Sequence, residues 1–411
     1  MGPAGDRSVR PVETSTDTNT DKQAYAPTRE VLLARAEALV PVLQERAEAG
    51  ERFRRCPDET IADFIAGDLL RICQPARYGG FELGYDVLCE VSQTLARGCG
   101  SQAWVHMVFA DNALKLSAYT LQAQDEVWGR DRNAKLANAV APVGRGQPVE
   151  GGVLWSGRHG FSSGVDHADW VMASGHIEHG DRRSGCSVLI PRRDITLVDD
   201  WHVLGLAGTG SKTFVVDKAF VPAHRILDKE AVDKGEAPGT LHYSAPVTKL
   251  PRGGVSAVSF TSVVVGIAEG FLTEYFRYTG PRLSRGTVVA EQMGVQISAG
   301  LSAAEVEAAS RMYLGAIRET MQMLARGETV SRHAQLRGKR NAAYAAQLAL
   351  RAVQRLFNAA GGRALYASNE LQRKFRDIHA AAAHHSLVWD TAAAAYGRYV
   401  LDRHGRSISE D

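Results

Sequence analysis

Apolar residues in the first third of the chain recur at the spacing of amphipathic helices. Over residues 28–132, Leu32, Leu39 and Leu43 fall on one face of a first helix, and Pro57 opens a second. These patterns predict an N-terminal helical domain. Three further helical stretches are predicted inside it, over residues 85–97, 102–121 and 122–128.

The pattern changes over residues 133–230, where short runs rich in Val, Ile, Thr and Trp alternate with turn residues. Strand-like runs begin at Trp170, Ser187 and Thr213, and glycine pairs such as Gly151-Gly152 separate such runs. Short runs with frequent turns predict a middle antiparallel β domain.

The remaining residues, 231–411, return to a helical pattern with long Ala-rich stretches. Residues 303–324 and 340–356 each cover several turns, and a Gly361-Gly362 break precedes a final predicted helix over residues 371–401. Small residues let helices pack closely, so this region predicts a C-terminal four-helix bundle. The fold class is therefore mainly α with a central β domain.

Composition narrows the class of protein. The 411 residues include 48 Lys and Arg against 46 Asp and Glu, a formal net charge of +2, which gives no sequence-wide attraction to nucleic acid or an anionic membrane. Residues 1–27 are polar and read as a disordered leader rather than a secretory signal, because they have no apolar core. No run approaches the roughly 20 apolar residues of a membrane span, so we expect a cytoplasmic protein.

The five cysteines are sparse, odd in number and form no C-x-x-C pair, so we expect reduced, packed thiols. The histidines are scattered, and no metal-binding spacing such as H-E-x-x-H occurs, so no metal is predicted.

Several short motifs are weak by themselves. Gly160 to Gly164 spells G-x-S-x-G, but the surroundings supply no helix for a hydrolase elbow, so the match is attributed to chance. Ser162 and Ser163 end a predicted strand before a glycine, where a planar ring could approach the backbone; ordinary strand-end polarity explains them as well. The stretch Gly208-Thr-Gly-Ser211 fits either a ligand-binding backbone turn or a simple turn.

Several further stretches follow one another through the helical domain, the β domain and the helical bundle. They are Pro75-Ala-Arg-Tyr-Gly-Gly-Phe-Glu82, Gly100-Ser-Gln-Ala-Trp104, Gln124-Asp-Glu-Val-Trp-Gly129, Trp155-Ser-Gly-Arg-His-Gly-Phe-Ser-Ser-Gly164, Gly205-Leu-Ala-Gly-Thr-Gly-Ser211, Phe220-Val-Pro222, Gly361-Gly-Arg-Ala364 and Arg376-Asp-Ile-His-Ala-Ala-Ala-Ala-His384. In these stretches and in its domain order, which is that of the acyl-CoA dehydrogenase fold, the chain from about residue 69 to residue 401 resembles the oxygenase components of two-component (group D) flavin-dependent monooxygenases, such as those acting on 4-hydroxyphenylacetate and phenolic steroids.

This resemblance implies a reaction. Reduced FMN or FAD would diffuse from a separate NAD(P)H-dependent flavin reductase, react with O2 to a C4a-hydroperoxyflavin, and hydroxylate a small aromatic or polycyclic substrate. It also implies a homotetramer, with flavin sites completed by a neighbouring subunit.

The resemblance further implies site residues. Ser163 matches the serine that hydrogen-bonds flavin N5, and His384 matches the histidine that orients a phenolate or stabilises charge on the peroxide. The expected substrate-binding residues are Trp104, Asn112 and His385, and the expected cofactor-binding residues are Ser162, Ser163, Thr209, Ser211, Arg285, Gly361 and Gly362.

Asn112 departs from the pattern, because many phenol-hydroxylating relatives carry a histidine there. An amide cannot take a proton, so phenol deprotonation must use another group, or the substrate is not a simple phenol. N-oxygenases of amino sugars, S-oxygenases and a non-catalytic flavin-binding partner subunit therefore stay open. An acyl-CoA dehydrogenase is disfavoured, because His385 stands where many of those enzymes carry the catalytic glutamate.

Overall fold

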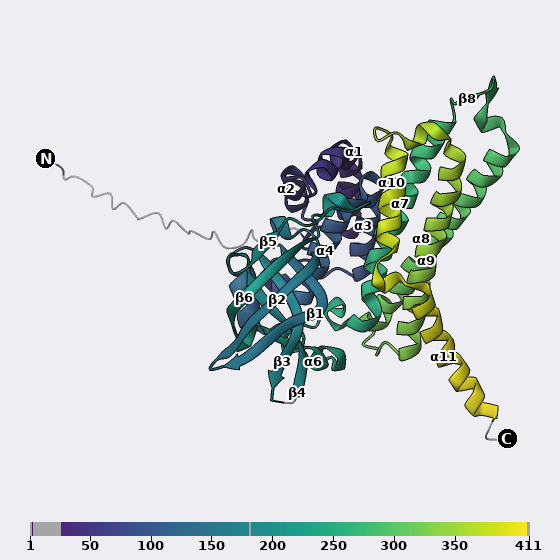
Figure 1. The fold of residues 1–411 in the computed structure, drawn as a ribbon. Helices are drawn as coiled ribbons and strands as arrows, with labels where there is room; N and C mark the ends of the chain where they lie inside the picture. The colour runs from purple at the N-terminus through teal and green to yellow at the C-terminus, as the bar shows by residue number, and fades with distance from the viewer. Residues whose placement is uncertain (1, 3–25, 181, 409–411) are drawn as a thin grey trace.

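The computed structural model describes residue 2, residues 26–180 and residues 182–408. The predicted leader over residues 1–27 therefore lies almost wholly outside the described residues. Figure 1 shows the N-terminal helices stacked above a twisted sheet, with the long C-terminal helices standing beside both.

Five helices make up the N-terminal part. Thr28 caps the first through its hydroxyl, which accepts a hydrogen bond from the amide of Val31, and the helix continues through Pro41. The fourth helix, α4, is buried along almost its whole length, its polar side chains included. The five are α1 (Arg29–Phe53), α2 (Asp58–Ala66), α3 (Tyr85–Gly98), α4 (Gly100–Leu116) and α5 (Leu121–Trp128).

A seven-stranded sheet follows, with the strand order β5-β6-β2-β1-β3-β4-β7. The strands of this sheet are β1 (Leu136–Val149), β2 (Gly152–Ser162), β3 (Trp170–His179), β4 (Arg182–Pro191), β5 (Thr196–Val198), β6 (Lys212–Pro222) and β7 (Ile226–Asp228). The helix α6 (Lys229–Lys234) follows directly after β7.

The prediction of a wholly antiparallel domain was wrong for one pair of strands. β1 pairs antiparallel with β2 but parallel with β3. Three consecutive strands alternate in direction, and β6 already occupies the other edge of β2, so β3 adds beside β1 and runs the same way. The sheet is therefore mixed.

The C-terminal helices pack around α7, whose central part is almost fully buried. Four of them form the bundle predicted for this region, and the fifth extends away from it toward the C-terminus (Figure 1). They are α7 (Arg252–Thr279), α8 (Met293–Ala325), α9 (Arg332–Ala360), α10 (Glu370–Ala382) and α11 (Trp389–Ile408), with a small hairpin of β8 (Leu283–Ser284) and β9 (Thr287–Val288) between α7 and α8.

The single final helix predicted over residues 371–401 is two helices. α10 ends at Ala382, and α11 begins at Trp389 after a turn that contains His384 in an extended conformation. Neither proline nor glycine marks this break, and the alanines around it favour a helix, so the local sequence conceals it.

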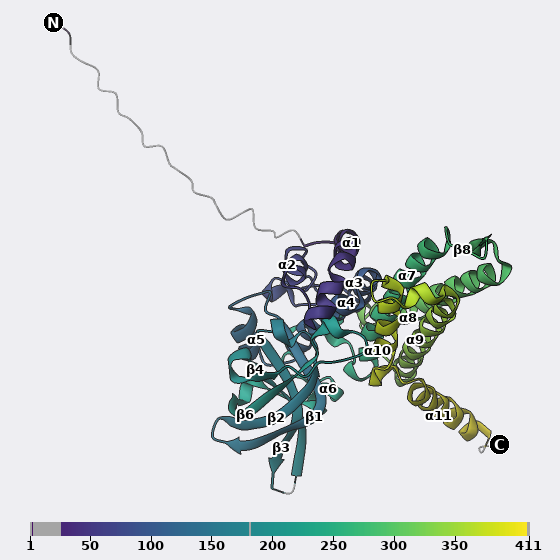
Figure 2. The same cartoon turned by 45° about the horizontal axis from the view of Figure 1, so that its top comes forward.

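α4 lies between the sheet and the C-terminal helices, where it contacts both β1 and α7 (Figure 2). Within the described residues, one stretch is long and apolar enough to cross a membrane, Ala257–Thr279, and 78% of its most apolar window is buried inside the protein. This stretch belongs to α7, so its apolar character is that of a core helix. All five cysteines are buried and without a disulfide, as expected.

Candidate active site

Trp104, Ser163, Thr209 and Ser211 form one hydrogen-bonded chain. The indole Nε1 of Trp104 donates to Ser163 Oγ at 3.1 Å, and Ser163 Oγ lies 2.7 Å from Ser211 Oγ. Ser211 Oγ is in turn 2.7 Å from Thr209 Oγ1. Four residues predicted from three separate stretches of sequence therefore meet between α4, the end of β2 and the turn before β6.

The direction of this chain follows from proton counting. Thr209 Oγ1 donates its only proton to the carbonyl of Leu206 at 2.7 Å, so Ser211 must donate to Thr209 and Ser163 to Ser211. Ser163 Oγ then accepts from Trp104 with one lone pair and keeps the other for a ligand. Because a reduced flavin carries a proton on N5, this free lone pair suits that edge of the ring.

The conformation and the hydrogen bond of Gly164 fix the backbone next to Ser163. Gly164 has a φ of 72° and donates its amide hydrogen to the carbonyl of Thr209 at 2.9 Å. A Cβ at Gly164 would lie 2.8 Å from the ring of Phe109. Only glycine fits this position without strain, and it brings the strand end against the turn that carries Thr209.

Phe161 and Ser162 present two features that suit a planar, polar ring. Phe161 is 81% exposed at a φ of 58°, with an edge-to-face contact to Trp201 at 5.8 Å between ring centroids. Ser162 Oγ is buried and has no hydrogen-bond partner among the described residues. A flavin would supply both an aromatic surface and acceptor atoms here, so the residues fit the group. The sequence did not single out Phe161 and Trp201, because the hydrophobic pattern does not reveal that an aromatic side chain is exposed.

His384 forms an aromatic cluster with Trp104 and Phe260. The ring centroids of Phe260 and His384 are 3.7 Å apart, and that of Trp104 is 5.8 Å from His384. His384 was expected on a helix, but it lies in the turn between α10 and α11, which lets its ring reach α4. Phe260 was missed, because one aromatic residue in an apolar helix looks like ordinary core.

Burial keeps His384 neutral. Burial is the largest cause, and together with the nearby His385 and Lys115 it lowers the pKa of His384 to about 3. The Nδ1 atom accepts a hydrogen bond from the amide of Ser386 at 3.3 Å, so the ring proton sits on Nε2. A neutral His384 can thus donate one hydrogen bond without carrying charge. The ring of His385 lies 4.3 Å from that of His384, and its side chain is exposed.

Asn112 lies on the same helix as Trp104 but does not join this cluster. Its Nδ2 donates to the carbonyl of Leu136 at 2.8 Å and to Asn138 Oδ1 at 3.1 Å, and its Oδ1 accepts from Lys115 Nζ at 3.1 Å. The side chain is fully buried. Asn112 therefore ties α4 to β1 and reaches open space only through its partners Asn138 and Lys115.

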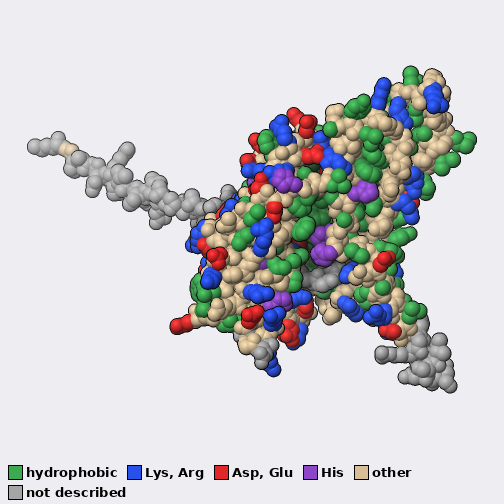
Figure 3. Space-filling view, in the orientation of Figure 1, with side chains coloured by type: hydrophobic (Ala, Val, Ile, Leu, Met, Phe, Trp, Pro, Cys, Tyr) green, Lys and Arg blue, Asp and Glu red, His purple; other side chains and the backbone are tan. Residues whose placement is uncertain are grey.

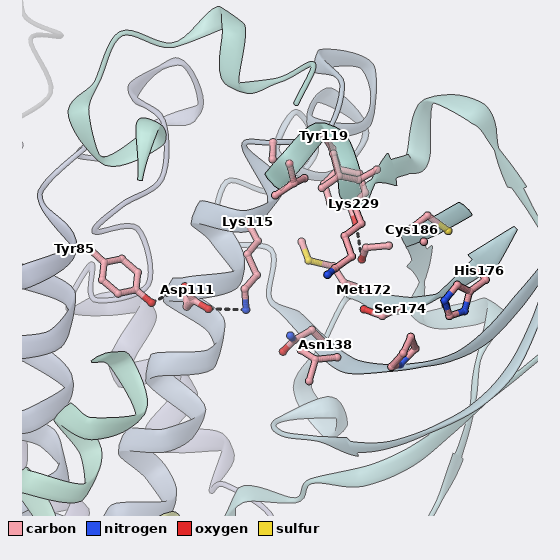
Figure 4. Close-up of a pocket in the computed structure, with 18 residues that line it drawn as sticks. Tyr85, Asp111, Lys115, Tyr119, Asn138, Met172, Ser174, His176, Cys186 and Lys229 are labelled. Carbon is pink, nitrogen blue, oxygen red and sulfur yellow. Dashed lines mark hydrogen bonds and ion pairs between the residues drawn. The ribbon is translucent and has the colours of Figure 1, made fainter. Parts of the chain in front are cut away.

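A cavity of about 510 Å³ lies next to these partners, between α4 and the sheet (Figure 4). Most of its lining is apolar, and Tyr85, Asp111, Lys115 and Asn138 cluster at one side. The other lining residues are Ala118, Tyr119, Val140, Pro142, Met172, Ser174, Gly175, His176, Gly185, Cys186, Ser187, Leu227, Lys229 and Val232. A space of this size holds a compound of several rings.

Arg285, Gly361 and Gly362 do not meet Ser163 within one chain. Arg285 occupies the exposed turn of the β8–β9 hairpin, which Figure 1 shows at the end of the long helices remote from the sheet. Gly361, at a φ of 76°, ends α9 beside the guanidinium of Arg282. These three predicted cofactor residues lie at one end of the bundle.

Comparison with known proteins now identifies the family. Residues 258–389 match the family described as acyl-CoA dehydrogenase, C-terminal domain. The chain is 33% identical over 369 residues to the flavin-dependent monooxygenase, oxygenase subunit HsaA, of Rhodococcus jostii (strain RHA1), covering 89% of this chain and 97% of that protein. This chain belongs to the flavin-dependent monooxygenases, as an oxygenase component.

Two further relatives agree with this membership. The oxygenase component is 30% identical to the p-hydroxyphenylacetate 3-hydroxylase, oxygenase component, of Acinetobacter baumannii, over 90% of this chain and 89% of that one. XiaF from Streptomyces sp., solved in complex with FADH2 and glycerol, superposes with a TM-score of 0.85 at 28% identity, over 90% of this chain and 94% of XiaF. The oxygenase component is thus a flavoprotein monooxygenase with the acyl-CoA dehydrogenase fold, as the sequence resemblance implied.

Proposed function

We propose that the oxygenase component takes reduced FMN or FAD from a separate NAD(P)H-dependent reductase and inserts one atom of O2 into a small aromatic or polycyclic substrate. The observation that carries this proposal is the directed chain from Trp104 to Ser163, which leaves an acceptor on Ser163, while the same indole packs edge-on against the ring of His384. The relatives named above support the substrate class, since one is a p-hydroxyphenylacetate 3-hydroxylase. Which of the two flavins is used stays part of the proposal.

The bound reduced flavin supplies the activation of oxygen, and the protein supplies position and exclusion of water. Ser163 Oγ would accept a hydrogen bond from the N5 edge, and the Ser162 hydroxyl, which has no partner among the described residues, would bond a second polar atom of the ring system. Phe161 would offer an aromatic surface to the ring. The Nε2–H of neutral His384 would donate a hydrogen bond to an oxygen atom at the reacting centre.

The test is rapid mixing of the flavin-free protein with reduced FMN or FAD, and then with oxygen. We expect a transient, oxygen-dependent absorbance before oxidised flavin appears, because the site slows loss of activated oxygen. Ser163→Ala should shorten this transient by about tenfold, the worth of one hydrogen bond in a buried site. Thr273→Ala, at an exposed position of α7 where the hydroxyl donates to the carbonyl of Glu269, is the matched control.

Immediate release of hydrogen peroxide by the wild-type protein with both flavins would contradict the proposal. So would a transient of unchanged lifetime in Ser163→Ala.

We propose further that the oxygenase component is a cytoplasmic homotetramer. Met293, Ile297 and Leu301 are 74%, 62% and 48% exposed and follow one another at four-residue intervals along α8, which makes an apolar stripe. Figure 3 shows apolar side chains at the end of the molecule that carries β8. A neighbouring chain packed there would bring Arg285 and Gly361 to a flavin held by another subunit.

Sedimentation velocity tests the assembly. We expect Ile297→Asp to dissociate the tetramer and to weaken reduced-flavin binding together, whereas Leu241→Asp, at an exposed leucine outside the apolar stripe, should change neither. A monomeric wild-type protein with full flavin affinity would overturn this proposal.

A further inference from the structure

The cavity between α4 and the sheet is apolar at its walls and charged at one point. Its lining includes Lys115 and Lys229 against Asp111 as the one acidic side chain, a formal charge of +1. The cavity opens to solvent, since two of its lining residues are well exposed: the side chain of Lys229 is 70% exposed and Val140 is 55% exposed. Lys115 is the more enclosed cation, with a side chain 30% exposed.

A continuous network fixes Lys115 in place (Figure 4). Its Nζ lies 2.6 Å from Asp111 Oδ2 and donates to Asn112 Oδ1 at 3.1 Å. The hydroxyl of Tyr85 donates to Asp111 Oδ1 at 2.8 Å, so both oxygens of this carboxylate are engaged. An ammonium group has three N–H donors. Within the described part of the chain, these two contacts use two of them, so the third is left for a ligand.

Lys115 also lies on the face of α4 that carries Trp104. Eleven residues separate them, which is three turns plus about 20°, and a rise of about 16 Å along the helix. Lys115 is close enough to contribute to the electrostatic environment of His384. The face of α4 therefore leads from the Trp104–Ser163 contact, where chemistry would occur, to the cation in the cavity.

Resting on the function proposed above, we propose that this cavity holds the substrate and that Lys115 binds an acidic oxygen on it. The substrate class is an aromatic compound of two or more rings that carries a phenol, bound as the phenolate, or a carboxylate. A phenol releases its proton to solvent on binding, and its O⁻ accepts a hydrogen bond from the third N–H of Lys115. Asp111 and Asn112 position the ammonium group.

The chemistry of Lys115 explains how this chain manages without a histidine at position 112. An amide cannot accept the phenol proton, but a fixed ammonium group lowers the free energy of the phenolate and so favours its formation. The ring bearing that oxygen becomes richer in electrons, which is what transfer of an electrophilic oxygen atom requires. Asn112 then acts through Lys115 and needs no direct contact with the substrate.

Equilibrium binding to the flavin-free protein tests the proposal with three probes of one shape: 2-naphthol, 2-methoxynaphthalene and 2-naphthoate. We expect the wild-type protein to bind 2-naphthol or 2-naphthoate about tenfold or more tightly than the methyl ether, the worth of one charge-assisted hydrogen bond. Absorbance of bound 2-naphthol should show the naphtholate. The stronger of the two acidic probes tells whether the recognised oxygen belongs to a phenol or to a carboxylate.

Lys115→Met should remove this preference and leave binding of 2-methoxynaphthalene unchanged, while Lys115→Arg should retain part of the preference. The matched control is Lys234→Met, because Lys234 forms the same i,i+4 ion pair at 2.6 Å, with Glu230, outside the cavity. Equal binding of all three probes by the wild type, or a preference unchanged in Lys115→Met, would overturn the inference. Either result is separable from failure of the proposed function, since the oxygen-dependent transient is measured without substrate.

Discussion

The indole of Trp104 donates a hydrogen bond to Ser163 Oγ across 3.1 Å, and this contact joins α4 to the end of β2. It holds the serine at the seam between the N-terminal helices and the sheet. An indole N–H can only donate, which agrees with a serine proton that points toward Ser211. The geometry of the site therefore depends on an aromatic residue that would otherwise be counted as core.

Trp104→Phe tests the importance of this bond. We expect the variant to keep its aromatic packing but to lose about 1 kcal/mol of stability and to bind reduced flavin less specifically, because Ser163 loses one of the two hydrogen bonds that hold its hydroxyl. Thermal unfolding and the lifetime of the oxygen-dependent transient check the two effects. Trp128→Phe is the control, since the Nε1 of Trp128 is buried without a hydrogen-bond partner among the described residues. A longer-lived transient in Trp104→Phe would contradict the assigned direction.

Gly164→Ala tests the close approach of the strand end to α4. Both the positive φ and the 2.8 Å contact with Phe109 oppose a methyl group, so we expect a loss of about 2–4 kcal/mol and loss of hydroxylation. Gly180→Ala isolates the backbone effect, because Gly180 has a φ of 60° with open space around it, and should cost about 1 kcal/mol. Chemical denaturation measures both. Similar losses in the two variants would show that the Phe109 contact is unimportant.

Asn112→Ala should destabilise the protein rather than abolish a proton transfer. It removes two hydrogen bonds that a fully buried amide donates to β1, one to the carbonyl of Leu136 and one to Asn138, which we expect to cost about 2–3 kcal/mol. Because Lys115 also loses an acceptor, the preference for acidic probes should weaken. Asn133→Ala, in the loop before β1, serves as the control in thermal unfolding. An unchanged melting temperature in Asn112→Ala would contradict its role as the tie between α4 and β1.

Acid should destabilise the protein through its buried histidines. Burial lowers the pKa of His106 and of His159 to about 4, below the ordinary value of 6.5. In the unfolded chain these rings gain protons below pH 6.5, whereas in the folded protein they stay neutral until about pH 4. Stability is therefore lost as pH falls through this window, by roughly 3 kcal/mol for fully buried His106.

Denaturant titrations between pH 7 and pH 4 measure this loss. His159→Phe should flatten part of the slope, because the ring packs on Phe214 at 4.9 Å and its Nδ1 is unpartnered among the described residues. His242→Phe, in an exposed turn, should leave the slope as it is. A slope that is the same in the wild type and in His159→Phe would contradict the assignment.

The candidate residues fall into two groups: those that meet within one chain and those that do not. Ser163, Thr209 and Ser211 lie in stretches whose local pattern predicts a strand end and a turn, so a sequence match places them correctly relative to one another. Arg285 and Gly361 lie in stretches that match as well, yet one chain leaves them remote from Ser163. Assembly of subunits, which local sequence does not encode, would decide their neighbours.

The sequence by itself determined the order of helices and strands, the position of the β domain and the family, because hydrophobic periodicity and short motifs are local properties of the chain. Only the tertiary structure decided three further features. β3 pairs parallel with β1 because β6 occupies the alternative edge. The α10–α11 break opens where the His384 ring packs on Phe260 and Trp104, which outweighs the helix propensity of the alanines around it. In the sequence, Asp111 and Lys115 are an ordinary i,i+4 pair, and they line a cavity because the sheet packs next to α4.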